Sequence, residues 1–347
     1  MGRAFGVQFW AAVVMVVTGV HILPANSYNH NLKYFSIWNT GAGAVEYPGD
    51  EMNSSFINFF FDIDRPELFQ ALADQGYGPS LLHVRTVLFY PRHDTRKGLR
   101  PDYAQRWNAT LEALLPLIKK RLAMGVFLGD ELCWDCVGWN DLKAAADLVR
   151  GTLPKSAVIY YNEAFPPLDD VGMWNASCGP KIALEQGYPH VPKSIDWVSI
   201  DYYPNEGTFE GAQRIYREKI FPKMNQEQRV LFVPPAFSCS KGSSAGFVDR
   251  FCCSKNNRDG ANPDCKGSCE NAMKDWAIKS YNWARTDDRF VGLNPWYWQQ
   301  KNTKVRPTYP KNHSDVPGLR WMNETRVLYE KIGMEIVTGN LRELSLD

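Results

Sequence analysis

The chain has 347 residues and a formal net charge of +1 at pH 7. A length of this order fits one large barrel or two ordinary domains. The balanced charge, with no basic cluster along the chain, argues against nucleic acid as a partner.

The first residues have the pattern of a secretory signal peptide, which we assign to residues 1–25. Arg3 supplies a positive charge, the run 9–20 is almost wholly apolar, and small residues follow near Ala25. The apolar run is shorter than the roughly 20 residues of a membrane span. We therefore expect a protein secreted to the extracellular space or the lumen of the secretory pathway, with no membrane contact after cleavage.

The remaining chain, residues 26–347, alternates short apolar runs with amphipathic stretches. Eight expected strands separated mainly by helices favour a single-domain α/β fold of the parallel TIM (β/α)8 type over an open doubly wound sheet. Dinucleotide-binding and P-loop motifs are missing, so we expect no cofactor. The strands are expected at 33–38, 56–61, 81–90, 125–129, 157–161, 195–204, 229–233 and 290–298. The helices are expected at 65–75, 101–123, 141–153, 209–220, 271–285 and 323–332.

Cysteines are numerous and all follow the signal segment. An even number in an oxidising compartment predicts up to four disulfides, with the pairing left open. The spacings Cys133-x-x-Cys136 and Cys265-x-x-x-Cys269 would also fit zinc, but the secretory route favours cross-links, so we expect no metal. The eight cysteines are Cys133, Cys136, Cys178, Cys239, Cys252, Cys253, Cys265 and Cys269.

Two further features fit the secretory route. The segment 238–270 holds five of the cysteines without sustained periodicity, which indicates a disulfide-rich insertion near the active face. Five Asn-x-Ser/Thr sequons predict a glycoprotein. They lie at Asn53, Asn108, Asn175, Asn312 and Asn323.

Carboxylates stand where three expected strands end. Asp130 and Glu131 end the fourth strand, Glu163 the fifth and Asp201 the sixth. The carboxyl ends of barrel strands form the face that carries chemistry, so Glu131 is the leading catalytic candidate, followed by Asp201 and Glu163. The alternative is that these acids only begin solvated loops or cap them.

Three of these strand ends resemble barrel glycoside hydrolases of the large clan that has an acid/base glutamate on strand four. The resemblance is carried by residues 127–131, 196–204 and 292–298. It implies that Glu131 is the general acid, that the ligand is a carbohydrate and that Asp130 lies near a sugar hydroxyl. It also implies that Trp296 or Trp298 forms the floor of a sugar subsite, although both could instead pack in the core. Neighbours of the acids complete the expected binding set, namely Asn162 and Tyr202.

One departure from that family concerns strand seven, where the relatives place a nucleophilic glutamate. Residues 232–237 contain no carboxylate here. Three alternatives follow: Asp201 or Glu163 could activate water in an inverting scheme, the substrate could supply the nucleophile, as in hexosaminidases, or the site could be inactive. The sequence therefore predicts a secreted glycosidase-like hydrolase, or else a silent carbohydrate-binding or extracellular-matrix protein of the same fold.

Overall fold

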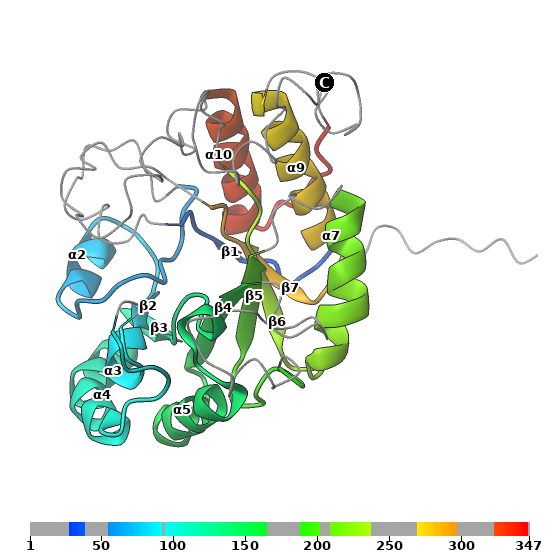
Figure 1. The fold of residues 1–347 in the computed structure, drawn as a ribbon. Helices are drawn as coiled ribbons and strands as arrows, with labels where there is room; N and C mark the ends of the chain where they lie inside the picture. Colours follow the sequence, from blue (N-terminus) through cyan, green and yellow to red (C-terminus); the bar gives the residue numbers. More distant parts are fainter. Residues whose placement is uncertain are drawn as a thin grey trace, which may run out of the picture.

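A computed structural model of the protein describes residues 28–38, 55–91, 94–164, 188–201, 209–236, 269–296 and 323–345. At its centre is a parallel seven-stranded sheet of order β1-β7-β6-β5-β4-β3-β2 (Figure 1). The strands are β1 (Tyr34–Phe35), β2 (Ser80–His83), β3 (Ala123–Phe127), β4 (Val158–Ala164), β5 (Trp197–Asp201), β6 (Arg229–Phe232) and β7 (Phe290–Leu293).

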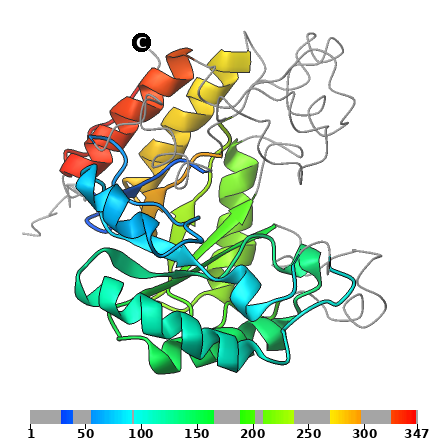
Figure 2. The same cartoon turned by 90° about the vertical axis from the view of Figure 1, so that its left-hand side faces the viewer.

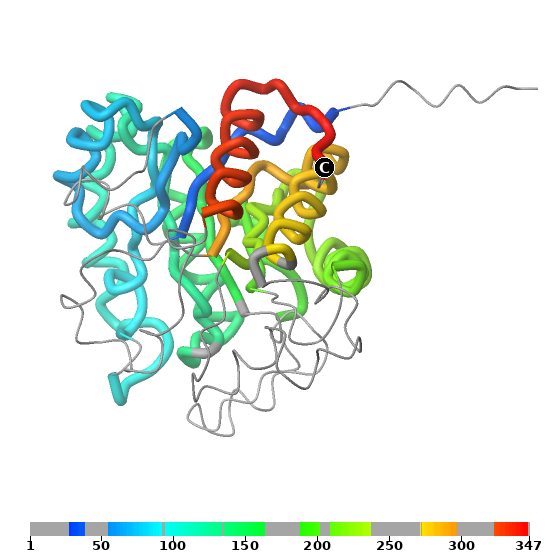
Figure 3. Tube along the Cα trace, turned by 90° about the horizontal axis from the view of Figure 1, so that it is seen from above, coloured from blue at the N-terminus to red at the C-terminus, as the bar shows by residue number. Residues whose placement is uncertain are grey.

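Helices lie outside this sheet, as in an α/β barrel. In Figure 1, α4 and α5 flank one end of the molecule and α9 and α10 the other. Figure 2, the side view, and Figure 3, the view from above, show α9 and α10 side by side, and both pack beside β7 or β1. The helices are α2 (Leu68–Asp74), α3 (Arg85–Leu88), α4 (Tyr103–Lys119), α5 (Trp139–Thr152), α7 (Phe209–Ile215), α9 (Cys269–Ala284) and α10 (Asn323–Thr338), with short turns η1 (Cys133–Asp135), η5 (Tyr216–Ile220) and η6 (Phe221–Lys223).

An eighth extended segment joins the two edges of the sheet. Residues 59–63 run parallel to β2, with Leu81 N–H donating to the Phe60 carbonyl (2.7 Å) and His83 N–H to that of Ile63 (2.7 Å). On the β1 side, Asn58 bonds to Phe35 through backbone and side chain, since its N–H donates to the Phe35 carbonyl at 3.1 Å and its Oδ1 accepts from Phe35 N–H at 2.9 Å. The sheet is therefore curled into a TIM-barrel-like arrangement, with the eight segments in the expected chain order.

The barrel interior is filled mainly by aromatic side chains. Phe127 stacks on Tyr160 with ring centroids 4.9 Å apart, and Phe61 meets Phe127 edge-on at 5.2 Å. Much of the aromatic content thus packs the barrel, as alternating inward residues do in this fold. The interior cluster comprises Trp38, Phe59, Phe61, Leu81, Phe127, Tyr160, Trp197, Leu231, Val233 and Val291. A second, larger cluster lies between the strands and the helices.

The third expected strand, 81–90, is too long. β2 ends at His83, and helix α3 follows, in which Leu88 N–H donates to the Val84 carbonyl. Val84 and Leu88 are both fully buried and one helical turn apart. The apolar run satisfies a helical spacing as well as a strand, so periodicity alone could not separate the two.

Several expected features lie outside the described residues. These are the signal segment 1–25, the insertion 238–270 up to the start of α9, and the sequons at Asn53, Asn175 and Asn312. Asn108 on α4 and Asn323 at the start of α10 are both exposed. Within the described part of the chain, no helix is long and apolar enough to cross a membrane.

Candidate active site

The ends of β4 and β5 place polar side chains over the aromatic interior. On β4 the inward residue Tyr160 is followed two positions later by Asn162, and on β5 Trp197 is followed by Ser199 and Asp201. Residues two apart share one face of a strand. Asn162, Ser199 and Asp201 therefore continue the interior face at the carboxyl end of the barrel, where enzymes of this architecture hold their chemistry.

A chain of hydrogen bonds connects these residues to Asp130. The Tyr160 hydroxyl lies 2.5 Å from Ser199 Oγ, Ser199 donates to Asn162 Oδ1, and Asn162 Nδ2 donates to Asp130 Oδ1 at 2.7 Å. Asn162 and Ser199 are fully buried, whereas Asp130 is partly exposed. The network thus orients one carboxylate oxygen of Asp130 at the open end of the barrel.

Asp201, on the neighbouring strand β5, affects the Tyr160 hydroxyl through its charge. Burial, together with the negative charges of Asp201 and Asp130, raises the pKa of the Tyr160 hydroxyl well above its usual value, although the hydrogen bond to Ser199 opposes this. Tyr160 therefore stays protonated and can donate into the network. The negative charges of two predicted carboxylates, Asp130 and Asp201, thus both affect this hydroxyl.

Glu131 has an unusual backbone. Its φ of 45° is left-handed, a region that a non-glycine residue occupies at a cost of about 1–3 kcal/mol and that clusters at functional sites. Its N–H donates to the Asn162 carbonyl at 3.0 Å, which ties it to the end of β4. The residue is partly exposed.

Glu163 occupies the other side of β4. Strand alternation puts it with the outward residue Tyr161, and it is fully buried, with Oε2 accepting from Cys133 N–H at 3.1 Å. Its charge, after burial, contributes to the raised pKa of Tyr161 and Tyr188. The structure does not bring Glu163 to Asp130 and Asp201, so a catalytic role for it stays a prediction that this placement does not favour.

The cysteines next to Glu131 differ from each other. Cys136 is disulfide-bonded. Cys133 is buried and carries no disulfide in this structure, so the cross-link predicted for it is not supported. It packs in the outer core cluster, where a thiol behaves as a small apolar group. Cys178, Cys239, Cys252, Cys253 and Cys265 lie outside the described residues, and Cys269 begins α9.

A histidine and an aspartate were missed by the sequence reasoning. His83 ends β2 two residues after the inward Leu81, its ring lies 4.9 Å from that of Phe127, and its Nδ1 is 2.8 Å from Asp62 Oδ1. Its Nε2 is buried and, within the described part of the chain, has no hydrogen-bond partner. His83 and Asp62 each lie at the end of an extended segment, and the two segments are neighbours. Their position at strand ends was the sequence signal that could have indicated a place at this face.

The β6 and β7 ends complete this face. Residues 233–236 are buried and carry no carboxylate, and the backbone of Pro235 pairs with that of Trp296. Trp296 is partly exposed and packs on the interior cluster, so the predicted sugar floor and core packing both remain compatible with it. Tyr202 and Trp298 lie outside the described residues.

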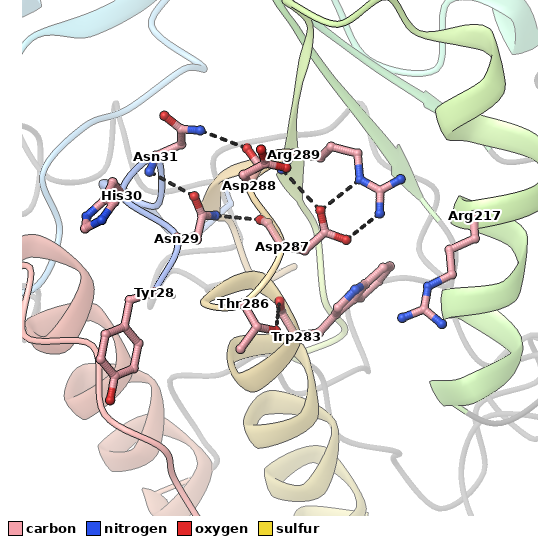
Figure 4. Close-up of a pocket in the computed structure, with 10 residues that line it drawn as sticks. All are labelled: Tyr28, Asn29, His30, Asn31, Arg217, Trp283, Thr286, Asp287, Asp288 and Arg289. Atoms are coloured by element: carbon pink, nitrogen blue, oxygen red, sulfur yellow. Dashed lines mark hydrogen bonds and ion pairs between the residues drawn. The ribbon is translucent and has the colours of Figure 1, made fainter. Parts of the chain in front are cut away.

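A groove of about 650 Å³ lies at the opposite end of the barrel (Figure 4). Its walls precede β1 and β7: Asn29 donates from its side chain to three backbone carbonyls, and Arg289 pairs with Asp287. In barrels of this type, residues at the amino-terminal face contribute to stability, whereas catalytic residues lie at the opposite face. The described residues contain no group of three or more metal-ligating side chains.

Comparison with known proteins finds distant likeness in fold only. No protein-family model matches the chain, and no curated protein matches it. Among solved structures, it is similar to a chitinase from Bacteroides thetaiotaomicron (11% identity, TM-score 0.45, covering 90% of this chain and 100% of that one). A β-glucuronidase from Ruminococcus gnavus has 11% identity and a TM-score of 0.46 over 87% of this chain and 50% of its own. A GH113 β-1,4-mannanase has 12% identity and a TM-score of 0.42 over 86% of this chain and 98% of its own.

Proposed function

We propose that this protein hydrolyses a glycosidic bond, with Glu131 as the general acid. The observation that carries the proposal is that Asp130 and Glu131 follow β3 and both bond to Asn162, while Asp201 ends the neighbouring β5, all at the carboxyl-terminal face of a parallel barrel. Paired carboxylates across an open face are the usual means of this reaction. The partly exposed Trp296, which packs on the aromatic interior, offers flat apolar surface to a sugar ring.

Each carboxylate has a distinct task in this proposal. Glu131 protonates the leaving-group oxygen as the bond from that oxygen to the anomeric carbon breaks. Asp201 takes a proton from a water molecule that attacks the anomeric carbon. Asp130, oriented by Asn162, accepts a hydrogen bond from a substituent of the sugar. The absence of a carboxylate at residues 233–236 disfavours a covalent enzyme intermediate formed there.

A substrate-supplied nucleophile is the main variant of this scheme. In that case the oriented carboxylate of Asp130 would bind the substrate group that attacks, and Asp201 would be dispensable. A panel containing both 2-acetamido sugars and unmodified sugars separates the two routes. Turnover confined to acetamido sugars and insensitive to Asp201→Asn would select the substrate-assisted route.

A silent carbohydrate-binding or extracellular-matrix protein is the second candidate. It is favoured by the apolar, buried end of β6, where a nucleophile would stand. Fold alone does not separate the two, because one architecture hosts many functions. Glycan binding without turnover by the wild type would select this candidate.

The test is turnover of the glycan panel by wild type and by Glu131→Gln. Removing a general acid costs about 10²- to 10⁴-fold in rate, so we expect at least a 100-fold loss. Glu227→Gln is the matched control, because Glu227 is exposed and precedes β6 at the opposite end of the barrel. Equal turnover by wild type and Glu131→Gln would refute the assignment.

A further inference from the structure

The loop between β3 and α5 carries both Asp130 and Glu131 and contains two non-glycine residues with left-handed backbones. They are Glu131, with φ 45°, and Cys136, with φ 65°. Such conformations persist only where the surrounding structure over-determines them. The contacts that hold the loop therefore help to set the position of Glu131.

Arg85, the first residue of α3, spans this loop. Its Nη1 donates to the Asp130 carbonyl at 3.4 Å, and its Nη2 forms an ion pair with Asp135 Oδ2. Both side chains are nearly buried, with 12% of Arg85 and 5% of Asp135 exposed. One guanidinium thus joins the residue before Glu131 to a residue four positions after it.

The stem of Arg85 also lies against the loop backbone. A Cβ added at Gly129 would come within 3.2 Å of both Cβ and Cγ of Arg85. On the far side, β4 holds the loop, since Glu131 N–H donates to the Asn162 carbonyl (3.0 Å) and Cys133 N–H to Glu163 (3.1 Å). Glu131 is therefore fixed between the end of β4 and the Arg85 side chain.

We propose that Arg85 is a positioning residue that holds Glu131 in its left-handed, proton-donating conformation. This inference rests on the proposed function. A buried ion pair is weak support for stability, because removing two charges from water offsets most of their attraction. Arginine suits the task because its planar fork can bond two groups at once, which a lysine cannot do in the same geometry.

The experiment removes both charges together, in Arg85→Met with Asp135→Leu. We expect a Tm within about 3 °C of wild type or above it, because apolar replacement of a buried pair is often neutral. We expect kcat to fall about 10- to 100-fold with KM changed less than about threefold, because misplaced catalytic groups lose rate rather than binding. Hydrogen exchange at the Glu131 and Cys133 amides should speed up by about 10-fold or more. The control is Lys143→Met with Asp147→Leu, an exposed pair on α5.

The outcomes separate this inference from the proposed function. Wild-type kcat and wild-type exchange in the Arg85 variant would overturn the inference, and the hydrolase assignment would survive. A kcat loss that merely follows a loss of Tm would also overturn it. A wild type that cleaves no glycan would refute the proposed function. In that case, amide exchange in the Arg85 variant that equals wild type would still refute the role of Arg85 in holding Glu131. If the double variant does not fold, Arg85→Lys replaces it as the test variant, and the same criteria for kcat and amide exchange apply.

Discussion

The Asn162 side chain donates a 2.7 Å hydrogen bond to the Asp130 carboxylate, joining the ends of β4 and β3. Because Asn162 Oδ1 also accepts from Ser199, the amide cannot turn without breaking two bonds. This bond links the buried polar network of the barrel to the partly exposed Asp130. The orientation of Asp130 is thus set by residues that no ligand needs to contact.

Asn162→Ala should lower both stability and turnover. The change leaves the buried Ser199 hydroxyl without the acceptor for its proton, which costs about 1–3 kcal/mol. We expect the free energy of unfolding in urea to fall by about 2 kcal/mol or more. Asn31→Ala, at the opposite end of the barrel, should change it by less than about 0.5 kcal/mol. An Asn162→Ala protein as stable and active as wild type would contradict the network.

The fold was largely predictable because its signals are local. Apolar runs and helix periods identified the strand order, and positions after strand ends identified Asp130, Glu131 and Asp201. The side of Glu163 was not foreseen, since a one-residue difference from Asn162 decides which face of β4 a side chain occupies. The His83–Asp62 pair was missed because its two members come from separate strands, and only the barrel closure made by residues 59–63 brings them together.

His83 and Asp62 should act as a unit. Asp62 contacts the His83 ring at Nδ1, so His83→Phe removes the imidazole and Asp62→Asn removes the charge beside it. We expect His83→Phe and Asp62→Asn each to reduce kcat about 10-fold or more, and the double variant to be no worse than the poorer single one. Phenylalanine keeps the ring contact with Phe127. Rate losses that multiply in the double variant would show that the two residues act independently.

The barrel should lose stability at alkaline pH. Burial raises the pKa of the Tyr160, Tyr161 and Tyr188 hydroxyls well above the usual value of 10.0. A group whose folded pKa is raised stabilises the fold below its unfolded pKa, and that stability is lost as pH rises from about 10 toward the folded value. Urea unfolding followed from pH 8 to about 11 should show the decline. Tyr160→Phe should make the decline shallower, and an unchanged slope would argue against this origin.

Secretion and glycosylation can be checked by mass. The apolar run 9–20 predicts cleavage near residue 25, and the exposed sequons Asn108 and Asn323 predict attached glycans. Expression in a eukaryotic secretory host should yield medium-borne protein that lacks residues 1–25 and loses mass on deglycosylation. Asn108→Gln should remove one glycan. A protein retained in the cell with its first residues intact would contradict the localisation.

The most direct measurement of the central claim is the leaving-group dependence of Glu131→Gln. A general acid matters most when the departing oxygen is a poor leaving group and little when it needs no proton. Against an alkyl glycoside, Glu131→Gln should lose about 100-fold or more in kcat/KM, whereas against a dinitrophenyl glycoside of the same sugar it should lose less than about 10-fold. Equal losses with both substrates, or no loss with either, would show that Glu131 does not donate the proton.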